Sequence, residues 1–474
     1  MVFSDLFFLF AFIPAFIICY LVAGLADKGK DAPTFKNTVL VCFSLIFYAW
    51  GEPIYVFLML VSVLINYKIG IWIDASDHHR KVFLVQGIVC NVLIIGIFKY
   101  AGFFATQLNN LGVPCEVPNI ALPIGISFYT FQSISYLIDV YRKDAPVQKK
   151  YMGLLLYISM FPQLIAGPIV RYGTVAEEIN KRSVTAKDIS DGITRFMIGL
   201  AKKVIIANQL SEIADQMLAN GMNSITVGGA WLGIIAFTLQ IYFDFSGYSD
   251  MAIGIGRCMG FHFNENFNHP YISRTITEFW RRWHMSLGSF FRDYVYIPLG
   301  GNRHHQWFNI LTVWFLTGMW HGASWNFILW GVYFGIIVLL EKYTILKIQK
   351  KIPNFILHIY TIVLFVLGWG IFYFDEFNNM LTFFNAAFGG VEDLVNIQCE
   401  SAMFEKFWIL VVALLFCMPI RHWASLLVEK LFGQGKFTEF IFVSSRLIFA
   451  VVVLVVATAL LVGATNNAFL YTRF

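Results

Sequence analysis

Two histidines stand where an ionisable side chain is costly, and both are suited to move a proton. His321 lies inside the apolar string from Met319 to Trp325, and His284 lies earlier, in a stretch that mixes aromatic and basic residues. An ionisable group within a membrane-embedded stretch usually has a function. Imidazole, with an ordinary pKa of about 6.5, can take a proton from an attacking hydroxyl at neutral pH. The residues alone leave ordinary roles open as well: His321 as a packing residue that donates to a carbonyl, and His284 as a side chain at the lipid headgroup level.

Two carboxylates form a second candidate centre. Asp244 and Asp250 fall in a hydrophobic segment that reads Tyr-Phe-Asp-Phe-Ser-Gly-Tyr-Ser-Asp from residue 242. Paired carboxylates can carry out acid–base or proton-relay chemistry. Arg257, Arg281 and Arg282 are nearby in sequence as counter-charges, so a structural ion-pair cluster is the favoured role.

Other common catalytic patterns are missing from the sequence. It contains no glycine-rich phosphate loop, no H-E-x-x-H pair and no G-x-S-x-G string. The seven cysteines are scattered without a C-x-x-C pair, so no metal site is expected. Only Cys115 and Cys399 fall in segments predicted outside the cell, where a disulfide between them is the less favoured alternative to free thiols.

Composition identifies the elements that must hold these side chains. Of the 474 residues, 58% are hydrophobic and only 13% are charged, whereas soluble domains carry about 25% charged residues. We therefore expect an all-α polytopic membrane protein. The net charge of +5 is small, and its basic residues cluster between apolar runs. This pattern excludes nucleic acid as an expected partner and instead orients the chain in a lipid membrane.

A helix needs about 20 apolar residues to cross a bilayer. Apolar segments fall near 3–24, 36–50, 54–73, 82–106, 120–140, 152–170, 190–218, 227–256, 307–319, 321–341, 354–374, 406–420 and 440–463. The segments 107–119, 219–226 and 375–405 contain no Lys or Arg and are expected outside, because basic loops stay in the cytoplasm. The pattern predicts 11 or 12 full spans, one domain over residues 1–474, and both termini outside.

Three segments depart from simple spans. Residues 152–170 have basic loops at both ends and are broken by Pro and Gly, which predicts a re-entrant element. The stretch from Ser273 to Pro298 is too polar to face lipid and is expected at the cytoplasmic interface. Residues 307–341 are long enough for two passes joined near the break from Gly318 to Gly322. This hairpin predicts that His321 lies at its turn or in its upper half and faces a cavity.

Ordered strings along most of the chain resemble the membrane-bound O-acyltransferase superfamily, and most closely its alginate-type bacterial members. They are LPIGISFYTFQ (122–132), FPQLIAGPIVR (161–171), IYFDFSGYSDMAIGIGRCMG (241–260), FNHPY (267–271), FWRRWHMSL (279–287), WHG (320–322) and FLYTRF (469–474). The resemblance implies an O-acyltransferase in which His321 is the catalytic histidine and His284 the second functional one. It also implies a ring of helices around a thinned core with a central tunnel.

The resemblance to alginate-type members further implies a donor, a partner and a location. The donor would be cytoplasmic acetyl-CoA, or another acyl thioester on CoA or a carrier protein, with no tightly bound cofactor. An extracytoplasmic partner of the SGNH-hydrolase type would acetylate hydroxyls of an exported polysaccharide. The location would be the bacterial cytoplasmic (inner) membrane. Arg281 and Arg282 are suited to the donor phosphates, although contact with anionic lipid fits them equally well.

Two alternatives stay open at this point. The same strings occur in members that acetylate other glycans, and a related branch transfers D-alanine to teichoic acid from a carrier protein. Ala468 also stands where alginate-type relatives are expected to carry proline, which bears on partner docking. In a different class, a transporter or channel would use His321, Asp244 and Asp250 as a pathway. Inverted repeats would favour transport, and none is found in the sequence.

Overall fold

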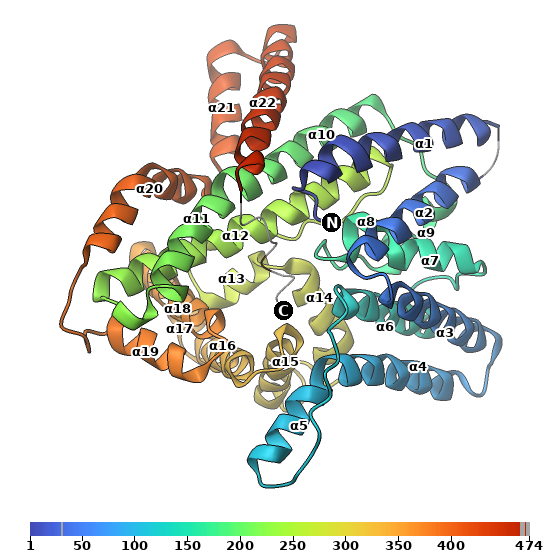
Figure 1. The fold of residues 1–474 in the computed structure, drawn as a ribbon. Helices are drawn as coiled ribbons and strands as arrows, with labels where there is room; N and C mark the ends of the chain where they lie inside the picture. Colours follow the sequence, from blue (N-terminus) through green and yellow to red (C-terminus); the bar gives the residue numbers. More distant parts are fainter. Residues whose placement is uncertain (30–31, 465–469, 471–474) are drawn as a thin grey trace. The chain divides into compact units, whose positions relative to one another are not determined.

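The computed structural model describes residues 1–29, 32–464 and 470, and this part of the chain contains helices and no strand (Figure 1). The helical class predicted from composition is confirmed. The described chain forms two compact units. The first contains residues 1–196 and 248–265, and the second contains residues 197–247 and 266–464 with Leu470. The expectation of one domain over residues 1–474 stays a prediction.

The first unit is built from the N-terminal helices. They are η1 (Phe8–Phe12), α1 (Ile13–Ala26), α2 (Thr34–Gly51), α3 (Tyr55–Ala75), α4 (Arg80–Ile95), η2 (Gly96–Tyr100), α5 (Ala101–Asn110), α6 (Ile126–Arg142), α7 (Tyr151–Ser159), α8 (Phe161–Leu164), α9 (Tyr172–Asn180) and most of α10 (Ala186–Leu200). The C-terminal part of α12 (Val227–Cys258) completes it. The chain therefore passes between the two units within α10 and within α12.

The second unit carries both histidines of interest. Its helices before the first histidine are η3 (Ala201–Ala207), α11 (Asn208–Ala214), η4 (Asp215–Ala219), η5 (Met222–Ser224), the first part of α12, η6 (Pro270–Ile272) and α13 (Ile276–Arg282). After His284 come α14 (Met285–Phe291), η7 (Arg292–Tyr296), α15 (Gln306–His321), α16 (Trp325–Tyr343), α17 (Ile345–Ile348), η8 (Gln349–Lys351), α18 (Asn354–Tyr373), α19 (Phe377–Ala387), α20 (Ile397–Phe416), α21 (Ile420–Phe432) and α22 (Lys436–Val462).

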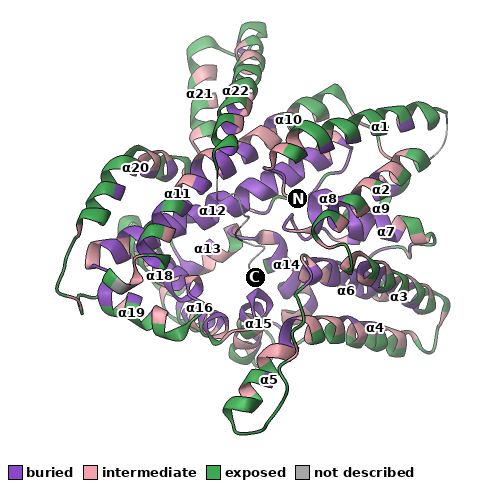
Figure 2. Ribbon diagram, in the orientation of Figure 1, coloured by how far each residue is buried: buried purple, intermediate pink, exposed green. Residues whose placement is uncertain are grey.

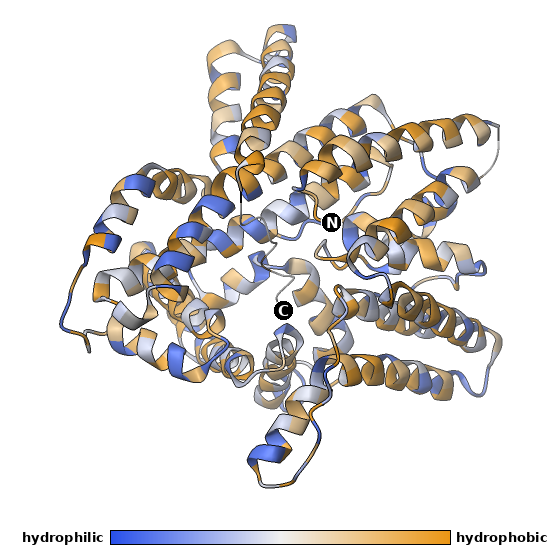
Figure 3. Cartoon of the chain, viewed as in Figure 1, coloured by the Kyte–Doolittle hydropathy of each residue, from blue (hydrophilic) through white to orange (hydrophobic). Residues whose placement is uncertain are grey.

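Seven helices or helix runs among the described residues are long and apolar enough to cross a membrane, or eight if the bent pair of α20 and α21 is one span. This is fewer than the 11 or 12 spans expected from the sequence. Several of the expected apolar segments form helices shorter than the usual length of about 20 residues for a span: α6 has 17 residues and α15 has 16. Figure 3 shows the long helices as mainly hydrophobic.

Burial separates helices that face protein from helices that face lipid. The apolar stretch of α12 is 78% buried, whereas that of α22 is only 11% buried (Figure 2). Apolar surface without a protein neighbour is stable where lipid covers it, and the backbone of a helix is satisfied internally in that setting. The chain is thus a multi-pass membrane protein with α12 in its interior, while the predicted tunnel and the outside location of the termini stay predictions.

The segment predicted to be re-entrant is a broken hairpin within the first unit. Helix α7 ends at Ser159, and after a break at Met160 the short α8 begins with a proline in its first turn. The two ends of the segment lie side by side, since Gln148 Nε2 donates to the Tyr172 hydroxyl at 3.2 Å. Its tip reaches Gly125, where φ is +77° and an added Cβ would lie 2.8 Å from the Leu164 oxygen. The hairpin geometry is confirmed, while its depth in the membrane stays a prediction.

The hairpin predicted around His321 is also confirmed. Helix α15 ends at His321, residues 322–324 form the turn, and α16 begins at Trp325. The two helices pack with backbones in near contact, because a Cβ on Gly331 would lie 3.1 Å from the Gly318 Cα. His321 therefore stands at the turn, as the sequence indicated.

The polar stretch from Ser273 to Pro298 does not form a span. It contains α13 and α14, with seven residues each, and the five-residue η7. At 1.5 Å per residue, a helix of seven residues is only about 10 Å long. These short helices instead carry Arg281, Arg282 and His284 within the second unit, and their place at the membrane interface stays a prediction.

Candidate active site around two histidines

His321 is enclosed by aromatic rings. Its side chain is 5% exposed, and its ring lies edge-on to the rings of Trp330, with centroids 4.9 Å apart, and Phe372, with centroids 5.1 Å apart. The ring of its neighbour Trp320 lies 4.8 Å away, again at a steep angle. Aromatic walls exclude water and lower the local dielectric constant, which strengthens any polar interaction made there.

His284 occupies the junction between α13 and α14 in a left-handed backbone conformation, with φ of +44°. Such a conformation costs a residue with a Cβ roughly 1 kcal/mol, so it persists only where the surroundings enforce it. The enforcing contact is with Asn266, whose backbone oxygen accepts from Met285 N at 2.9 Å. The chain between residues 266 and 285 is thereby closed into a loop that turns the imidazole inward, where only 2% of the residue is exposed.

Asn266 also fixes the tautomer of His284. The Asn266 Oδ1 atom accepts from the backbone N–H of Ser286 at 3.2 Å and from the Ser286 hydroxyl at 2.9 Å, which identifies it as the amide oxygen. The Nδ1 atom of His284 lies 3.0 Å from the same oxygen. Because this oxygen only accepts, Nδ1 carries the proton and the lone pair of the ring is on Nε2.

The two histidines meet at one side chain. Trp320 contacts both, since its ring centroid lies 5.8 Å from that of His284 and 4.8 Å from that of His321. Phe245 on α12 packs edge-on against His284, with centroids 4.7 Å apart. The structure therefore brings together the two residues that the sequence proposed as catalytic, in one aromatic enclosure of the second unit.

Burial lowers the pKa of His284 to about 3. Removal from water disfavours the charged imidazolium and leaves the neutral ring favoured. His284 is consequently neutral across the physiological pH range, with a proton on Nδ1 and an acceptor on Nε2.

The two arginines of α13 have different surroundings. Arg282 pairs with Glu278 one turn earlier, at 2.8 Å, and donates to the Asn268 oxygen at 3.4 Å. Arg281 is exposed, and its charge acts on the ammonium group of Lys342. Arg281 and Lys342 thus form a cationic pair suited to an anionic ligand, whereas Arg282 is engaged in holding α13.

Asp244 has the structural role that the sequence favoured, but the expected counter-charge was wrong. Its Oδ1 atom lies 2.6 Å from the Lys203 ammonium group, and both side chains are at least 95% buried. Its Oδ2 atom accepts from the backbone N–H of Leu470 at 2.8 Å. Lys203 belongs to η3, which falls within the apolar segment expected at 190–218. The remaining terminal residues of the FLYTRF string, and Ala468, lie outside the described residues.

Asp250 likewise pairs with a residue other than those expected. Arg195 Nη2 lies 2.7 Å from the Asp250 carboxylate and 2.5 Å from that of Glu265, all within the first unit. Burial of Asp244 and Asp250 with opposite charges satisfies them, since an unpaired buried charge is strongly destabilising.

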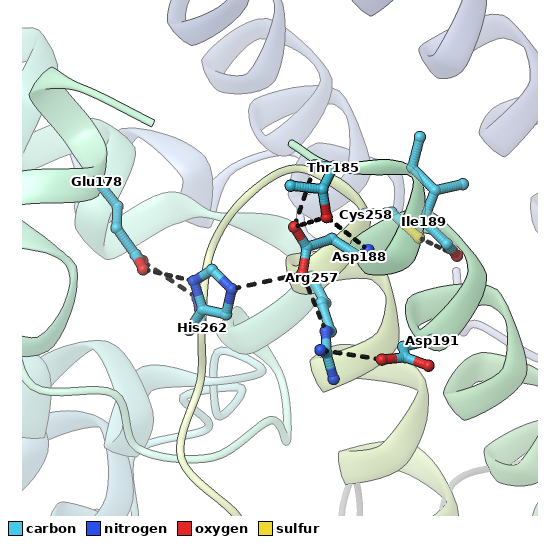
Figure 4. Close-up of polar contacts among 8 residues, drawn as sticks. All are labelled: Glu178, Thr185, Asp188, Ile189, Asp191, Arg257, Cys258 and His262. Atoms are coloured by element: carbon cyan, nitrogen blue, oxygen red, sulfur yellow. Dashed lines mark hydrogen bonds and ion pairs between the residues drawn. The ribbon is translucent and has the colours of Figure 1, made fainter. Parts of the chain in front are cut away.

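Arg257, the third expected counter-charge, serves a surface network in the first unit (Figure 4). It contacts the Asp191 carboxylate at 3.0 Å and that of Asp188 at 3.4 Å. His262 Nδ1 lies 2.7 Å from Glu178, which joins the loop after α12 to α9. Hydrogen bonds from Thr185 and the charge of Arg257 lower the pKa of Asp188 to about 2. The network fixes the C-terminal end of α12 to α9 and α10.

Cys115 and Cys399 are free thiols, so the less favoured disulfide is not formed. His78, His79, His304 and His305 are exposed, as expected for residues of polar loops.

Sequence reasoning missed two polar residues that support the site: Asn266, beside His284, and Glu341, at the far end of α16 from His321. Asn266 is one of three asparagines in a short polar run and carries no distinguishing local signal. Glu341 was passed over at the end of an apolar segment, although a buried acidic residue in a membrane helix is itself a signal.

Comparison with known proteins identifies the family. Residues 42–384 match the model of MBOAT, the membrane-bound O-acyltransferase family. The probable alginate O-acetylase AlgI of Pseudomonas aeruginosa is 43% identical over 383 residues, which cover 78% of this chain and 72% of that protein. The peptidoglycan O-acetyltransferase of Helicobacter pylori is 34% identical over 78% of this chain and 77% of its own length. The teichoic acid D-alanyltransferase of Bacillus subtilis is 30% identical over 50% of this chain and 63% of its own length.

The matched residues run from α2 to α19 and include both histidines, Asn266 and Glu341. The match confirms the resemblance seen in the sequence strings, and it sets the transporter alternative aside. The chain is a polytopic membrane enzyme that belongs to the membrane-bound O-acyltransferase family.

Proposed function

We propose that this enzyme transfers an acetyl group from a cytoplasmic thioester donor toward the hydroxyl groups of an exported cell-envelope polysaccharide. The observation that carries the proposal is the pair of buried histidines that meet at Trp320. The acetyl group is favoured over D-alanine because the alginate-type and peptidoglycan-type relatives match 78% of this chain, whereas the D-alanyltransferase matches 50%.

In the proposed reaction, His321 is the general base. Its imidazole takes the proton of the attacking hydroxyl as the new C–O bond forms at the thioester carbonyl, and the imidazolium then stabilises the oxyanion. Collapse of the tetrahedral intermediate breaks the C–S bond, and the proton passes to the leaving thiolate. Positioned proton transfer of this kind contributes typically 10²- to 10⁴-fold. His284, neutral and held by Asn266, lines the site beside His321 and orients the incoming acceptor, whose hydroxyl proton goes to His321.

The family and the pattern of basic loops support a proposed setting for the reaction. We place the enzyme in the bacterial cytoplasmic membrane with both termini outside, the donor being acetyl-CoA or an acyl carrier on the inner side. An extracytoplasmic partner of the SGNH-hydrolase type would complete the transfer to the polysaccharide. The names of three relatives refer to alginate, peptidoglycan and teichoic acid, and they support an envelope polymer as the final acceptor.

Mass spectrometry of cell-envelope glycans tests the acyl group and the acceptor together. Cells with the intact enzyme are expected to carry O-acetyl groups, seen as the mass increment of an acetyl group in place of hydrogen on a defined polymer, and cells without it are expected to lose them. The His321→Ala variant at equal membrane abundance is the matched control. A D-alanyl increment would replace the acetyl proposal, and unchanged glycans would contradict the function.

Arg281 is expected to bind the phosphates of the donor. Arg281→Ala should raise the KM for the thioester donor about tenfold, because one charge-assisted hydrogen bond contributes about 1.5–3 kcal/mol, and leave kcat within twofold. Lys342→Ala should act in the same direction. Steady-state kinetics in detergent or nanodiscs provide the measurement, with exposed Lys430 on α21 changed to alanine as the control.

Arg282→Ala is expected to behave differently from Arg281→Ala. It removes the contacts with Glu278 and Asn268, so it should lower thermal stability more than donor affinity. An unchanged KM in Arg281→Ala at low ionic strength would assign that guanidinium to lipid contact instead.

A further inference from the structure

Glu341 is a fully buried carboxylate near the end of α16, and the proposed reaction does not use it. The residue is 0% exposed. Its Oε1 atom accepts from Ile276 N at 2.6 Å, and its Oε2 atom accepts from Thr277 N at 2.7 Å and from the Thr277 hydroxyl at 2.6 Å. Three donors from α13 thus converge on one side chain.

These donors include the first two backbone N–H groups of α13. The first N–H groups of any helix lack partners within the helix and must be satisfied from outside. Thr275 satisfies the third by accepting from Glu278 N at 3.0 Å, so Glu341 and Thr275 together cap the start of α13. A carboxylate also complements the positive end of the helix dipole. Glu341 therefore fixes where α13 begins and how it is rotated.

Each of the two helices that Glu341 joins leads to one of the histidines. Helix α13 ends at Arg282, two residues before His284, and α16 begins at Trp325, four residues after His321. At one end α13 and α16 are joined through Glu341, and at the other His284 and His321 both contact Trp320. Trp280 on α13 packs between these ends against Trp330 and Phe334 of α16.

We infer that Glu341 is a positioning residue for acyl transfer: its hydrogen bonds to the start of α13 set the placement of His284 relative to His321. The inference rests on the proposed roles of the two histidines. Loss of the carboxylate frees α13 to shift along α16, and a displacement of about 1 Å at a reacting group can cost about 10²-fold in rate.

Glu341→Gln is the sharpest test because it keeps size and shape. A glutamine has one accepting oxygen, and its NH₂ group would face a second donor, so at least one N–H of α13 loses its partner. We expect kcat to fall about 10²-fold with the donor KM within twofold of wild type. Glu341→Asp, which keeps both oxygens on a shorter side chain, should recover part of the rate. Thr277→Val removes a single hydrogen bond and should cost severalfold.

The matched control is Asn396→Ala, which removes a cap from α20, a helix without either histidine. It should lose stability without a specific loss of kcat. An equal loss of kcat in Asn396→Ala, wild-type kcat in Glu341→Gln, or a change confined to KM would each overturn the inference. If Glu341→Gln does not accumulate in the membrane, the Thr277→Val variant provides the test instead. A wild-type kcat in Thr277→Val would then overturn the inference. Failure of the proposed function is distinguishable, because it would appear as activity in the histidine variants themselves.

Discussion

Replacing His321 by alanine is expected to abolish acyl transfer while the protein stays folded in the membrane. The imidazole is the only group proposed to accept the hydroxyl proton, and general-base catalysis alone contributes typically 10²- to 10⁴-fold. The imidazolium that would stabilise the oxyanion is lost as well, so the rate should fall to background. Single-turnover transfer from a labelled acetyl thioester, measured on purified enzyme, gives the comparison.

His321→Gln separates chemistry from packing. His321 fills a space among Trp320, Trp330 and Phe372, and truncation to alanine leaves a cavity that destabilises the hairpin. Glutamine fills most of that volume and is not a base. Equal inactivity of both variants, with monodisperse size-exclusion profiles, would assign the loss to the missing base. Acyl transfer within tenfold of wild type in either variant would remove His321 from the mechanism.

His284→Ala is expected to lose most activity, about 10²-fold or more, because the acceptor loses the side chain that orients its hydroxyl toward His321. The same enzymatic assay applies. Asn266→Asp keeps an oxygen acceptor for Nδ1–H and should retain more activity than Asn266→Leu, which leaves the ring without its fixed tautomer. Wild-type activity in His284→Ala would restrict this residue to a structural role.

The pH dependence of stability gives an independent check on His284. Its folded pKa, about 3, lies below the ordinary value of about 6.5. Between these values the unfolded chain binds a proton that the folded chain does not, so stability is fully present above about pH 6.5 and declines as the pH falls. The Tm of the wild type should therefore fall more steeply from pH 7 to pH 5 than the Tm of His284→Gln. Parallel curves would contradict a buried, neutral imidazole.

Much of the fold was predictable because the bilayer imposes strong rules on sequence. Apolar length and basic loops located the helical segments, and Pro and Gly located the broken hairpin at α7 and α8. Composition could not give the number of long apolar helices, because it does not show where each helix ends: α6 has 17 residues and α15 has 16. The segment 375–405, expected as an outside loop, contains α19 and the start of α20.

The two histidines were predictable because an ionisable side chain is costly in apolar surroundings. The residues that hold them in place were not predictable. His284 and His321 stand out as ionisable groups in apolar surroundings. Asn266 and Glu341 act through backbone N–H groups that depend on how a loop closes and where a short helix starts. The partners of Asp244 and Asp250 were misassigned because Lys203 and Arg195 are distant in sequence and were hidden within an amphipathic helix.

The side-by-side ends of the hairpin formed by α7 and α8 also constrain how the protein is made. Nine residues of α7 extend only about 14 Å, so the translocation machinery has no span to release into lipid at this point. Its docking partners lie earlier in the chain, since Ser44 on α2 accepts from Phe161 N and Gly125 before α6 receives the tip. Both partners are therefore already synthesised when the hairpin emerges, so it can fold against protein instead of lipid.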